Sequence, residues 1–535
     1  MKISRRSLAK GSLALSCIAY QLRSDLLFAG DKFDGDCGVA SGSPTENSVV
    51  IWTRIPIQFQ PAPFLFENVE VLYEVSKTSD FLELDIVAKG VTNTSAKSDF
   101  TVKAKVSNLT AFTTYYYRFK TTSGYISVVG RTKTAPSKNH HLDSIKFGVV
   151  ACQRFSGGFY SAYEHLATED IDFCVHLGDH IYEKESGKIR PDDTTMKGKT
   201  ALTLDEFRFK YRYYLSDPAW REVRRLHPWI DLWDDHEVTD NYSGLDLKAK
   251  NPGLLNAGYQ SFCEYLPVDV EFSDVKNSES ELRIYKQIKY GDILDLFLLD
   301  QRQYRTDSPC IKTFNTEGCE EMEGPQNTML GSKQKDWFLN EIVSSKAKWK
   351  FVLSEVVFAK FLLPKVNGPE LVSSSDDPFD TYSSKNDKVF LNLDAWDGYP
   401  SERQELTQHF YRHQLKNIVF LTGDVHSAYN SKICLNDDLD KVVALEIVTA
   451  PISSSPLQRG MQKYFGDQAT EVVLESNPWT EWADLKNNGY TIIRATKDSL
   501  VVDHKVVSSV ATPKADLILK RRVSVLDGEY QFRKS

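Results

Sequence analysis

The sequence lacks the features that mark membrane-spanning, nucleic-acid-binding and disulfide-rich proteins. No apolar run approaches the ~20 residues that crossing a bilayer requires. The formal net charge is -8, so there is no basic excess to attract nucleic acid. Eight cysteines among 535 residues are too few for a disulfide scaffold, although Cys310 and Cys319 could pair within a polar loop. The remaining picture is an ordinary globular composition, and the length predicts two domains.

Residues 1–30 have the pattern of a targeting segment. Arg5 and Arg6 precede a short, mildly apolar stretch over residues 11–22, which resembles a twin-arginine export signal. A frayed basic N-terminus is the alternative. We therefore expect delivery by the twin-arginine export machinery to the periplasm, the cell surface or the extracellular medium.

Residues 31–136 read as a small all-β domain. Polar and apolar residues alternate over short stretches separated by polar turns, which is typical of a β-sandwich. The run LTAFTTYYY at 109–117 resembles the corner of a fibronectin type III or immunoglobulin-like sandwich. Strands are expected at residues 49–55, 71–76, 100–109, 114–121 and 127–136. No catalytic cluster lies here, and residues 137–142 read as a linker.

Residues 143–535 alternate long apolar strands with helices, the pattern of an α/β domain. The strands are almost continuously apolar, so both faces of the sheet should be covered. Strands are expected at residues 145–152, 172–178, 229–233, 293–300, 349–358, 417–423, 443–450, 489–496 and 499–506. Helices are expected at residues 204–226, 254–265, 332–344 and 402–414.

Several of these strands deliver acidic and histidine side chains into the loop where the strand ends. The stretch WDDHEVTDNY at 233–242 follows one apolar run, and the same pattern recurs in FCVHLGDHIYE at 173–183 and IVFLTGDVHSAY at 418–429. Burying that many carboxylates without a counter-charge costs several kcal/mol per group. In an α/β sheet the carboxyl ends of the strands line one crevice. Together with Cys152, these ends predict a metal site.

The donor types at these strand ends indicate which metals they suit. They combine a thiolate, a phenolate, imidazoles and carboxylates, a set that fits a trivalent iron beside a harder divalent ion. Asp179 is placed to bridge two ions about 3.5–4 Å apart, a pair that activates water and clamps phosphoryl oxygens. The residues are Cys152, Asp179, Tyr182, Asp235, His236, Asp424 and His426.

The same residues carry a family resemblance. GDHIY at 178–182, DDHE at 234–237 and GDVH at 423–426 look like variants of the calcineurin-like metallophosphoesterase blocks. Tyr182 and Cys152 depart from those blocks and resemble the PhoD-like alkaline phosphatase/phosphodiesterase family. Further matches to that family are GVASG at 38–42, WTR at 52–54, GRT at 130–132, DQRQYR at 300–305 and WDGYP at 396–400. The resemblance covers nearly the whole chain after residue 30.

The resemblance implies a fold, an activity and a ligand set. The fold would be a four-layer α/β/β/α metallophosphoesterase sandwich preceded by the all-β domain. The activity would be hydrolysis of phosphomonoesters or phosphodiesters by metal-activated hydroxide. Fe3+ would be held by Cys152, Asp179, Tyr182 and His426. One or two Ca2+ would be held by Asp179, Asp235 and Asp424.

Three further side chains are candidates for catalysis. His236 could protonate the leaving oxygen or orient the phosphate, and its alternative is a hydrogen bond within its own loop. Arg154 and Arg305 could bind non-bridging phosphate oxygens or could pair with nearby carboxylates. Glu355, in the stretch LSEVVF, falls where another polar group at a strand end is expected, and whether it is a ligand stays open.

Two other functions compete with this interpretation. A purple-acid-phosphatase-like enzyme also combines a β-sandwich with an iron-tyrosinate centre, but usually has histidines where this chain has Cys152 and Asp424. An exported binding protein with a structural metal site is the other. Such a protein would have no measurable enzymatic turnover, and removal of its metal would unfold it. The preference between monoester and diester substrates is left undetermined, as is the role of the loop at residues 367–386.

Overall fold

In the computed structural model, the described residues are 35–60, 68–190, 196–275, 282–307, 319–364 and 388–535. The predicted export signal, the 367–386 loop and Cys310 lie outside them. Cys319, the predicted partner of Cys310, is disulfide-bonded. Within the described ranges, no helix is both long enough and apolar enough to cross a membrane.

Two large mixed sheets contain most of the strands. The larger sheet has the order β23-β22-β21-β20-β8-β9-β10-β1-β2-β5, and the smaller has the order β11-β12-β13-β16-β18-β17-β19. The strands of the larger sheet are β1 (Val39–Gly42), β2 (Val49–Arg54), β5 (Thr101–Val106), β8 (Ile145–Val150), β9 (Phe173–His176), β10 (Pro228–Asp231), β20 (Gly489–Ala495), β21 (Ser499–Val507), β22 (Leu517–Leu526) and β23 (Arg533–Lys534). Those of the smaller sheet are β11 (Lys286–Tyr290), β12 (Leu294–Leu298), β13 (Trp349–Ser354), β16 (Ile418–Thr422), β17 (Ala428–Cys434), β18 (Val442–Val448) and β19 (Thr480–Asp484).

The two sheets pack face to face around a shared apolar core. Phe147 of β8 meets Phe351 of β13 edge to face, with ring centroids 5.5 Å apart. The same cluster takes in Val175 of β9, Leu421 of β16 and Ile493 of β20, all buried. One face of each apolar strand is therefore covered by the other sheet, because both sheets have an apolar inner face.

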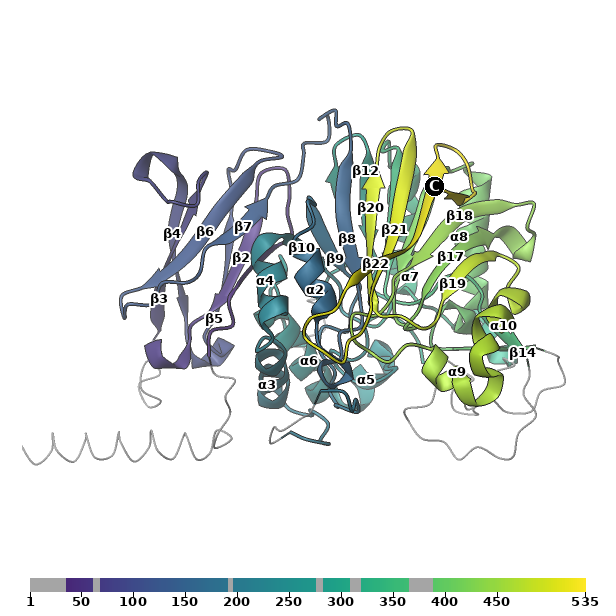
Figure 1. The fold of residues 1–535 in the computed structure, drawn as a ribbon, viewed down its shortest axis with the longest axis horizontal. Coiled ribbons are helices and arrows are strands. Elements are labelled where there is room, and N and C mark those ends of the chain that lie inside the picture. The colour runs from purple at the N-terminus through teal and green to yellow at the C-terminus, as the bar shows by residue number, and fades with distance from the viewer. Residues whose placement is uncertain (1–34, 61–67, 191–195, 276–281, 308–318, 365–387) are drawn as a thin grey trace, which may run out of the picture.

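Helices cover the outer faces, which completes the predicted four layers (Figure 1). The helices near the larger sheet are α2 (Ser161–Leu166), α3 (Leu204–Tyr214), α4 (Pro218–Leu226), α5 (Gly244–Lys250) and α6 (Pro252–Tyr265). Near the smaller sheet lie α7 (Gly331–Ser344), α8 (Pro400–Arg412), α9 (Gln458–Phe465) and α10 (Ala469–Ser476), beside the short strands β14 (Leu362–Pro364) and β15 (Lys388–Phe390).

The prediction of one continuous helix over residues 204–226 is wrong. The chain forms α3 and α4 with a break at residues 215–217. Pro218 cannot donate a backbone hydrogen bond and takes the first position of α4, while Asp217 caps that helix by accepting from the amides of Ala219 and Trp220. The aromatic stripe continues across the break because both helices pack on the same core.

The all-β region is joined to the larger sheet by backbone hydrogen bonds. A four-stranded sheet, β4 (Ile86–Thr94), β3 (Val69–Ser76), β6 (Thr114–Thr121) and β7 (Gly130–Lys133), forms one half of the sandwich, on the left of Figure 1. The other half is β1, β2 and β5, and β1 pairs in parallel with β10. The Tyr115 hydroxyl accepts a hydrogen bond from the backbone of Thr110 at 2.9 Å, the contact of a tyrosine corner.

Candidate metal centre

Four strand ends meet at one place between the two sheets. β8, β9 and β10 are parallel neighbours, so the loops after them emerge at the same edge of the larger sheet. These loops carry Cys152, Asp179 and Asp235. The facing sheet contributes the loop after β16, which carries Asp424 and His426. The expectation that separate strand ends line one crevice matches this arrangement.

Backbone contacts hold the loops against one another. The amide of Cys152 donates to the carbonyl of Gly178 at 3.2 Å. A Cβ on Gly178 would lie 2.4 Å from the Cβ of Asp234, so only glycine permits this approach of the second loop to the third. The buried carboxylate of Glu237 then ties the same two loops together, accepting from the amides of His180 at 2.5 Å and Asp234 at 2.8 Å.

The backbone at the site is strained. Cys152, Asp179, Asp424 and His426 all have positive φ, at 56°, 62°, 64° and 53°. A left-handed conformation is uncommon for residues other than glycine and costs of order 1–3 kcal/mol each, so such residues collect where function requires a fixed side-chain direction. Four of the six residues that the sequence analysis assigned to metal binding share this conformation.

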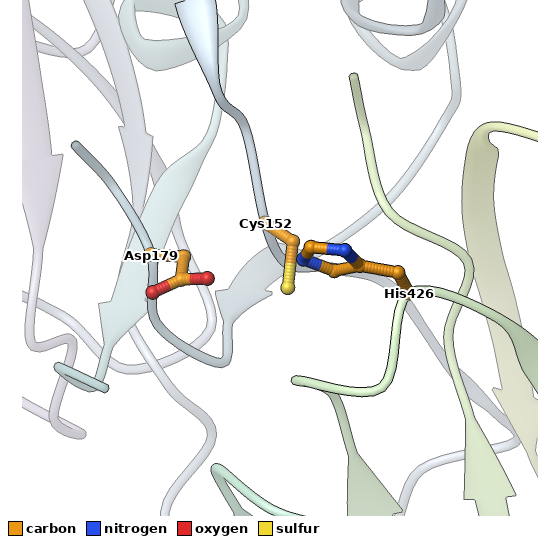
Figure 2. Close-up of side chains that lie close together, drawn as sticks. All are labelled: Cys152, Asp179 and His426. Atoms are coloured by element: carbon orange, nitrogen blue, oxygen red, sulfur yellow. The ribbon is translucent and has the colours of Figure 1, made fainter. Parts of the chain in front are cut away.

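The ligand atoms fall into three overlapping groups, each with its atoms within 4.8 Å of one another. The groups are Cys152, Asp179 and His426; Asp179, Asp235 and His236; and Asp234, Asp235 and Asp424. Figure 2 shows the first group, in which the three side chains converge from separate loops. Asp179 belongs to two groups and Asp235 to two, so the groups form a continuous row. Asp234 is a candidate ligand that the sequence analysis did not assign.

Tyr182 completes the first group. Its hydroxyl donates to Asp179 Oδ2 at 2.6 Å and lies 3.2 Å from His426 Nε2. It also accepts a hydrogen bond from the Ser454 hydroxyl at 2.7 Å. The phenol is therefore placed beside the thiol, the carboxylate and the imidazole with which the sequence analysis grouped it.

The electrostatics of this row call for a cation. Burial raises the pKa of Asp179 well above its usual value; His236 opposes this shift, and the neighbouring carboxylates add to it. Burial likewise raises the pKa of Cys152. Asp179 Oδ1 and Asp235 Oδ1 are buried and have no hydrogen-bond partner among the described residues. Unpartnered buried carboxylate oxygens are costly, and a bound cation would supply the missing partner. The residues present therefore fit a metal centre.

His236 lies at the edge of this row. Its Nδ1 is 2.7 Å from Glu183 Oε2, and its ring packs on that of Tyr182 with centroids 4.1 Å apart. Burial opposes its charge, but the carboxylates of Asp235 and Glu183 raise the pKa of His236 well above its usual value. The side chain keeps 14% of its surface exposed, so His236 can reach a molecule in the crevice.

The two predicted arginines occupy different environments. The Arg154 guanidinium lies 4.1 Å from the centroid of the Tyr182 ring, is partly exposed, and donates to Ser186. Arg305 is buried and donates to Asp394 and to the carbonyls of Tyr242 and Asn241. Of the two roles considered for Arg305, the structure favours pairing with a carboxylate. Arg154 lies beside Tyr182, one of the predicted iron ligands.

Arg302 is a counter-charge that the sequence analysis missed. Its side chain is fully buried and pairs with Asp234 at 2.6 Å and Asp394 at 2.5 Å, while Nη2 lies 3.9 Å from Asp424 Oδ1. It therefore neutralises part of the acidic row. Glu355 is buried as well, both its oxygens lack a partner among the described residues, and burial raises its pKa well above the usual value.

The fold and the site define a class before any comparison is made. Two facing mixed sheets with helices outside, and metal-type ligands at their strand ends, are the architecture of a metallophosphoesterase. A profile of the PhoD-like phosphatase family matches residues 147–504, and one of the N-terminal domain of PhoD-like phosphatases matches residues 28–136.

Individual relatives agree with the profiles. Alkaline phosphatase D of Bacillus subtilis (strain 168) is 30% identical over 519 residues, covering 94% of this chain and 82% of that protein. A solved structure described as "Structure of PhoD" superposes with a TM-score of 0.79 at 27% identity, covering 95% of this chain and 92% of that one. The chain belongs to the PhoD-like phosphatase family and is a hydrolase of phosphoric ester bonds.

Proposed function

We propose that this hydrolase is an exported phosphoesterase whose centre holds one Fe3+ and one or two Ca2+. The observation that carries the proposal is the row of three overlapping ligand groups, in which two buried carboxylate oxygens have no hydrogen-bond partner within the described part of the chain. The iron ligands would be Cys152, Asp179, Tyr182 and His426. The calcium ligands would be Asp179, Asp235 and Asp424, with Asp234 available to a second calcium.

The donor chemistry supports this division of metals. Thiolate, phenolate and imidazole donors favour a transition metal, whereas a group made only of carboxylates favours a hard cation such as Ca2+. Asp179 shares one group with Cys152 and His426 and another with Asp235, so it would be a ligand common to the two ions. When bound, the pair of cations supplies an activated water and neutralises charge on the phosphoryl group.

The side chains around the row have separate tasks in this proposal. Arg154, partly exposed beside Tyr182, would bind a non-bridging phosphate oxygen through charge-assisted hydrogen bonds. His236 would donate a proton from Nε2 to the leaving oxygen, since its Nδ1 is already bonded to Glu183. Arg305 would act only through the fold, because its donors are used by Asp394 and by backbone carbonyls.

Export rests on residues outside the described ranges. The arginine pair Arg5 and Arg6 ahead of a short apolar stretch supports passage through the twin-arginine machinery. Replacing both arginines by lysine in the full chain should leave the protein inside the cell. Unchanged export of that variant would contradict the proposed route.

The test of the function combines a phosphoester panel with metal removal. We expect the purified protein to hydrolyse p-nitrophenyl phosphate or bis(p-nitrophenyl) phosphate, to lose activity on chelation, and to regain it when iron and calcium are restored. Cys152→Ser should lose most of the activity. Cys174→Ser is the matched control, because Cys174 is an equally buried cysteine on the neighbouring strand that belongs to none of the ligand groups. Full activity after exhaustive chelation would refute the metal-dependent proposal.

A further inference from the structure

A buried carboxylate next to the predicted iron ligands belongs to none of the three ligand groups. Glu183 follows Tyr182 in the loop after β9 and keeps only 5% of its surface exposed. Its Oε2 lies 2.7 Å from His236 Nδ1, and its Oε1 accepts from the amide of Asp240 at 3.3 Å. Both oxygens are therefore used by one stretch of chain, the loop after β10.

These two contacts fix the ring of His236 from one side. An imidazole that is bonded through Nδ1 to a carboxylate holds its proton there and presents Nε2 outward. The Tyr182 ring restricts His236 from a second direction, packing at 4.1 Å and 35°. The remaining nitrogen, Nε2, lies 3.7 Å from Asp240 Oδ1, at the partly exposed rim. Its orientation is thus set by residues of two different loops.

We infer that Glu183 is a positioning residue that acts through His236, holding Nε2 toward the leaving oxygen of the phosphoester. The inference rests on the proposed role of His236 as the proton donor. It adds a residue that the sequence analysis did not single out and that is not itself placed among the metal ligands. A correctly oriented donor contributes about 10²–10⁴-fold to a rate, so a loosened ring should lose part of that factor.

The test separates positioning from general stability by using the leaving group. Phenyl phosphate needs protonation of its departing oxygen much more than p-nitrophenyl phosphate does, because p-nitrophenolate is the weaker base. Glu183→Gln keeps the size of the side chain but cannot serve both donors, since one end of an amide is itself a donor. We expect kcat for phenyl phosphate to fall about tenfold, kcat for p-nitrophenyl phosphate to fall less than threefold, and KM to stay nearly unchanged.

A double-mutant cycle supplies the decisive comparison. His236→Ala should lower kcat for phenyl phosphate about 100-fold, and adding Glu183→Gln to it should change the rate by less than about twofold, because the residue on which Glu183 acts is gone. Glu185→Gln is the matched control. Glu185 is a buried glutamate in the same loop that bonds Ser156 and Tyr214, so its variant should not alter the ratio of the two substrates.

Each outcome bears on a different claim. If His236→Ala affects neither substrate, the proton-donor role fails, and the inference about Glu183 fails with it. Only the positioning role is refuted if His236→Ala lowers kcat for phenyl phosphate but Glu183→Gln has normal rates. The same holds if Glu183→Gln lowers kcat equally for both substrates. The positioning role is also refuted if adding Glu183→Gln to His236→Ala lowers kcat for phenyl phosphate by a further tenfold. Should Glu183→Gln not fold, Glu183→Asp, which withdraws the carboxylate by one methylene, should show the same selective loss.

Discussion

Replacing Arg302 by methionine should make the stability of the protein depend much more strongly on calcium. Arg302 is fully buried and makes ion pairs with Asp234 at 2.6 Å and Asp394 at 2.5 Å, and its third nitrogen lies 3.9 Å from Asp424. Removing one partner of a buried ion pair costs roughly 3–5 kcal/mol, because the remaining charges lose their counter-charge. We expect a loss of that size in the unfolding free energy when the protein is measured in chelator.

Calcium should restore part of that loss. A cation held by Asp234 and Asp424 would replace the positive charge that Arg302 supplied, and the variant should bind calcium about fivefold more tightly. By linkage, fivefold tighter binding returns about 1 kcal/mol at saturating calcium. The assay is urea denaturation of wild type and variant, followed by tryptophan fluorescence, each in chelator and in a calcium series.

Arg305→Met is the matched control for this experiment. Arg305 is also buried, but it pairs with Asp394 and with backbone carbonyls and not with Asp234 or Asp424. In chelator, Arg305→Met should lose as much unfolding free energy as Arg302→Met. Calcium should not reduce the loss in Arg305→Met. If calcium reduces both losses equally, or neither, the reasoning that Arg302 and a cation serve the same carboxylates is refuted.

Three further predictions concern separate parts of the molecule. Cys152→Ser should remove iron and any visible charge-transfer band, as judged by elemental analysis and absorption, whereas Cys174→Ser should keep both; equal metal content would contradict the ligand assignment. Burial raises the pKa of Glu446 to about 7, so its contribution to stability is lost as pH rises from about 4.5 through 7, at most about 1.4 kcal/mol per pH unit. As pH rises across that range, the urea midpoint of Glu446→Gln should therefore rise relative to that of wild type. A difference in midpoint that does not change with pH would refute this. Asp99, half-buried where the all-β region meets α3, pairs with Arg212 and with the buried Arg54, and Asp99→Asn should cost roughly 3–5 kcal/mol of unfolding free energy because Arg54 loses its counter-charge; a loss below about 1 kcal/mol would contradict a structural role for these pairs.

The ligand types at the site could be predicted from the sequence because each follows an apolar strand. Asp179, Asp235 and Asp424 stand directly after such runs, and the loops after parallel neighbouring strands must open at one edge of the sheet. The PhoD-like resemblance, which the comparisons confirm, placed them in one family pattern.

The contacts that arrange these ligands could not be predicted in the same way. Ser454 donates to Tyr182 from 272 residues away, and nothing near it in the sequence marks it as part of the site. Arg302 and Arg305 belong to one motif, yet only the fold decides that the first approaches Asp424 while the second is held by backbone carbonyls.

The strand pattern predicts the fold class, but it does not predict which strands share a sheet or what covers each face. Continuous apolar strands indicate that both faces are covered, and they do not say that the second face meets another sheet. Likewise, the parallel pairing of β1 with β10 joins segments far apart in the chain, and no local sequence pattern indicates it. The break before Pro218 did have a local signal, an aspartate followed by proline, which the continuous aromatic stripe concealed.

The central claim is that the overlapping ligand groups hold iron and calcium in the working enzyme. The most direct test is elemental analysis of protein purified without chelator, together with its visible absorption spectrum. We expect iron and calcium in the same preparation, with a visible band that disappears in Tyr182→Phe. Protein that contains neither metal and still hydrolyses phosphoesters at its full rate would contradict the account.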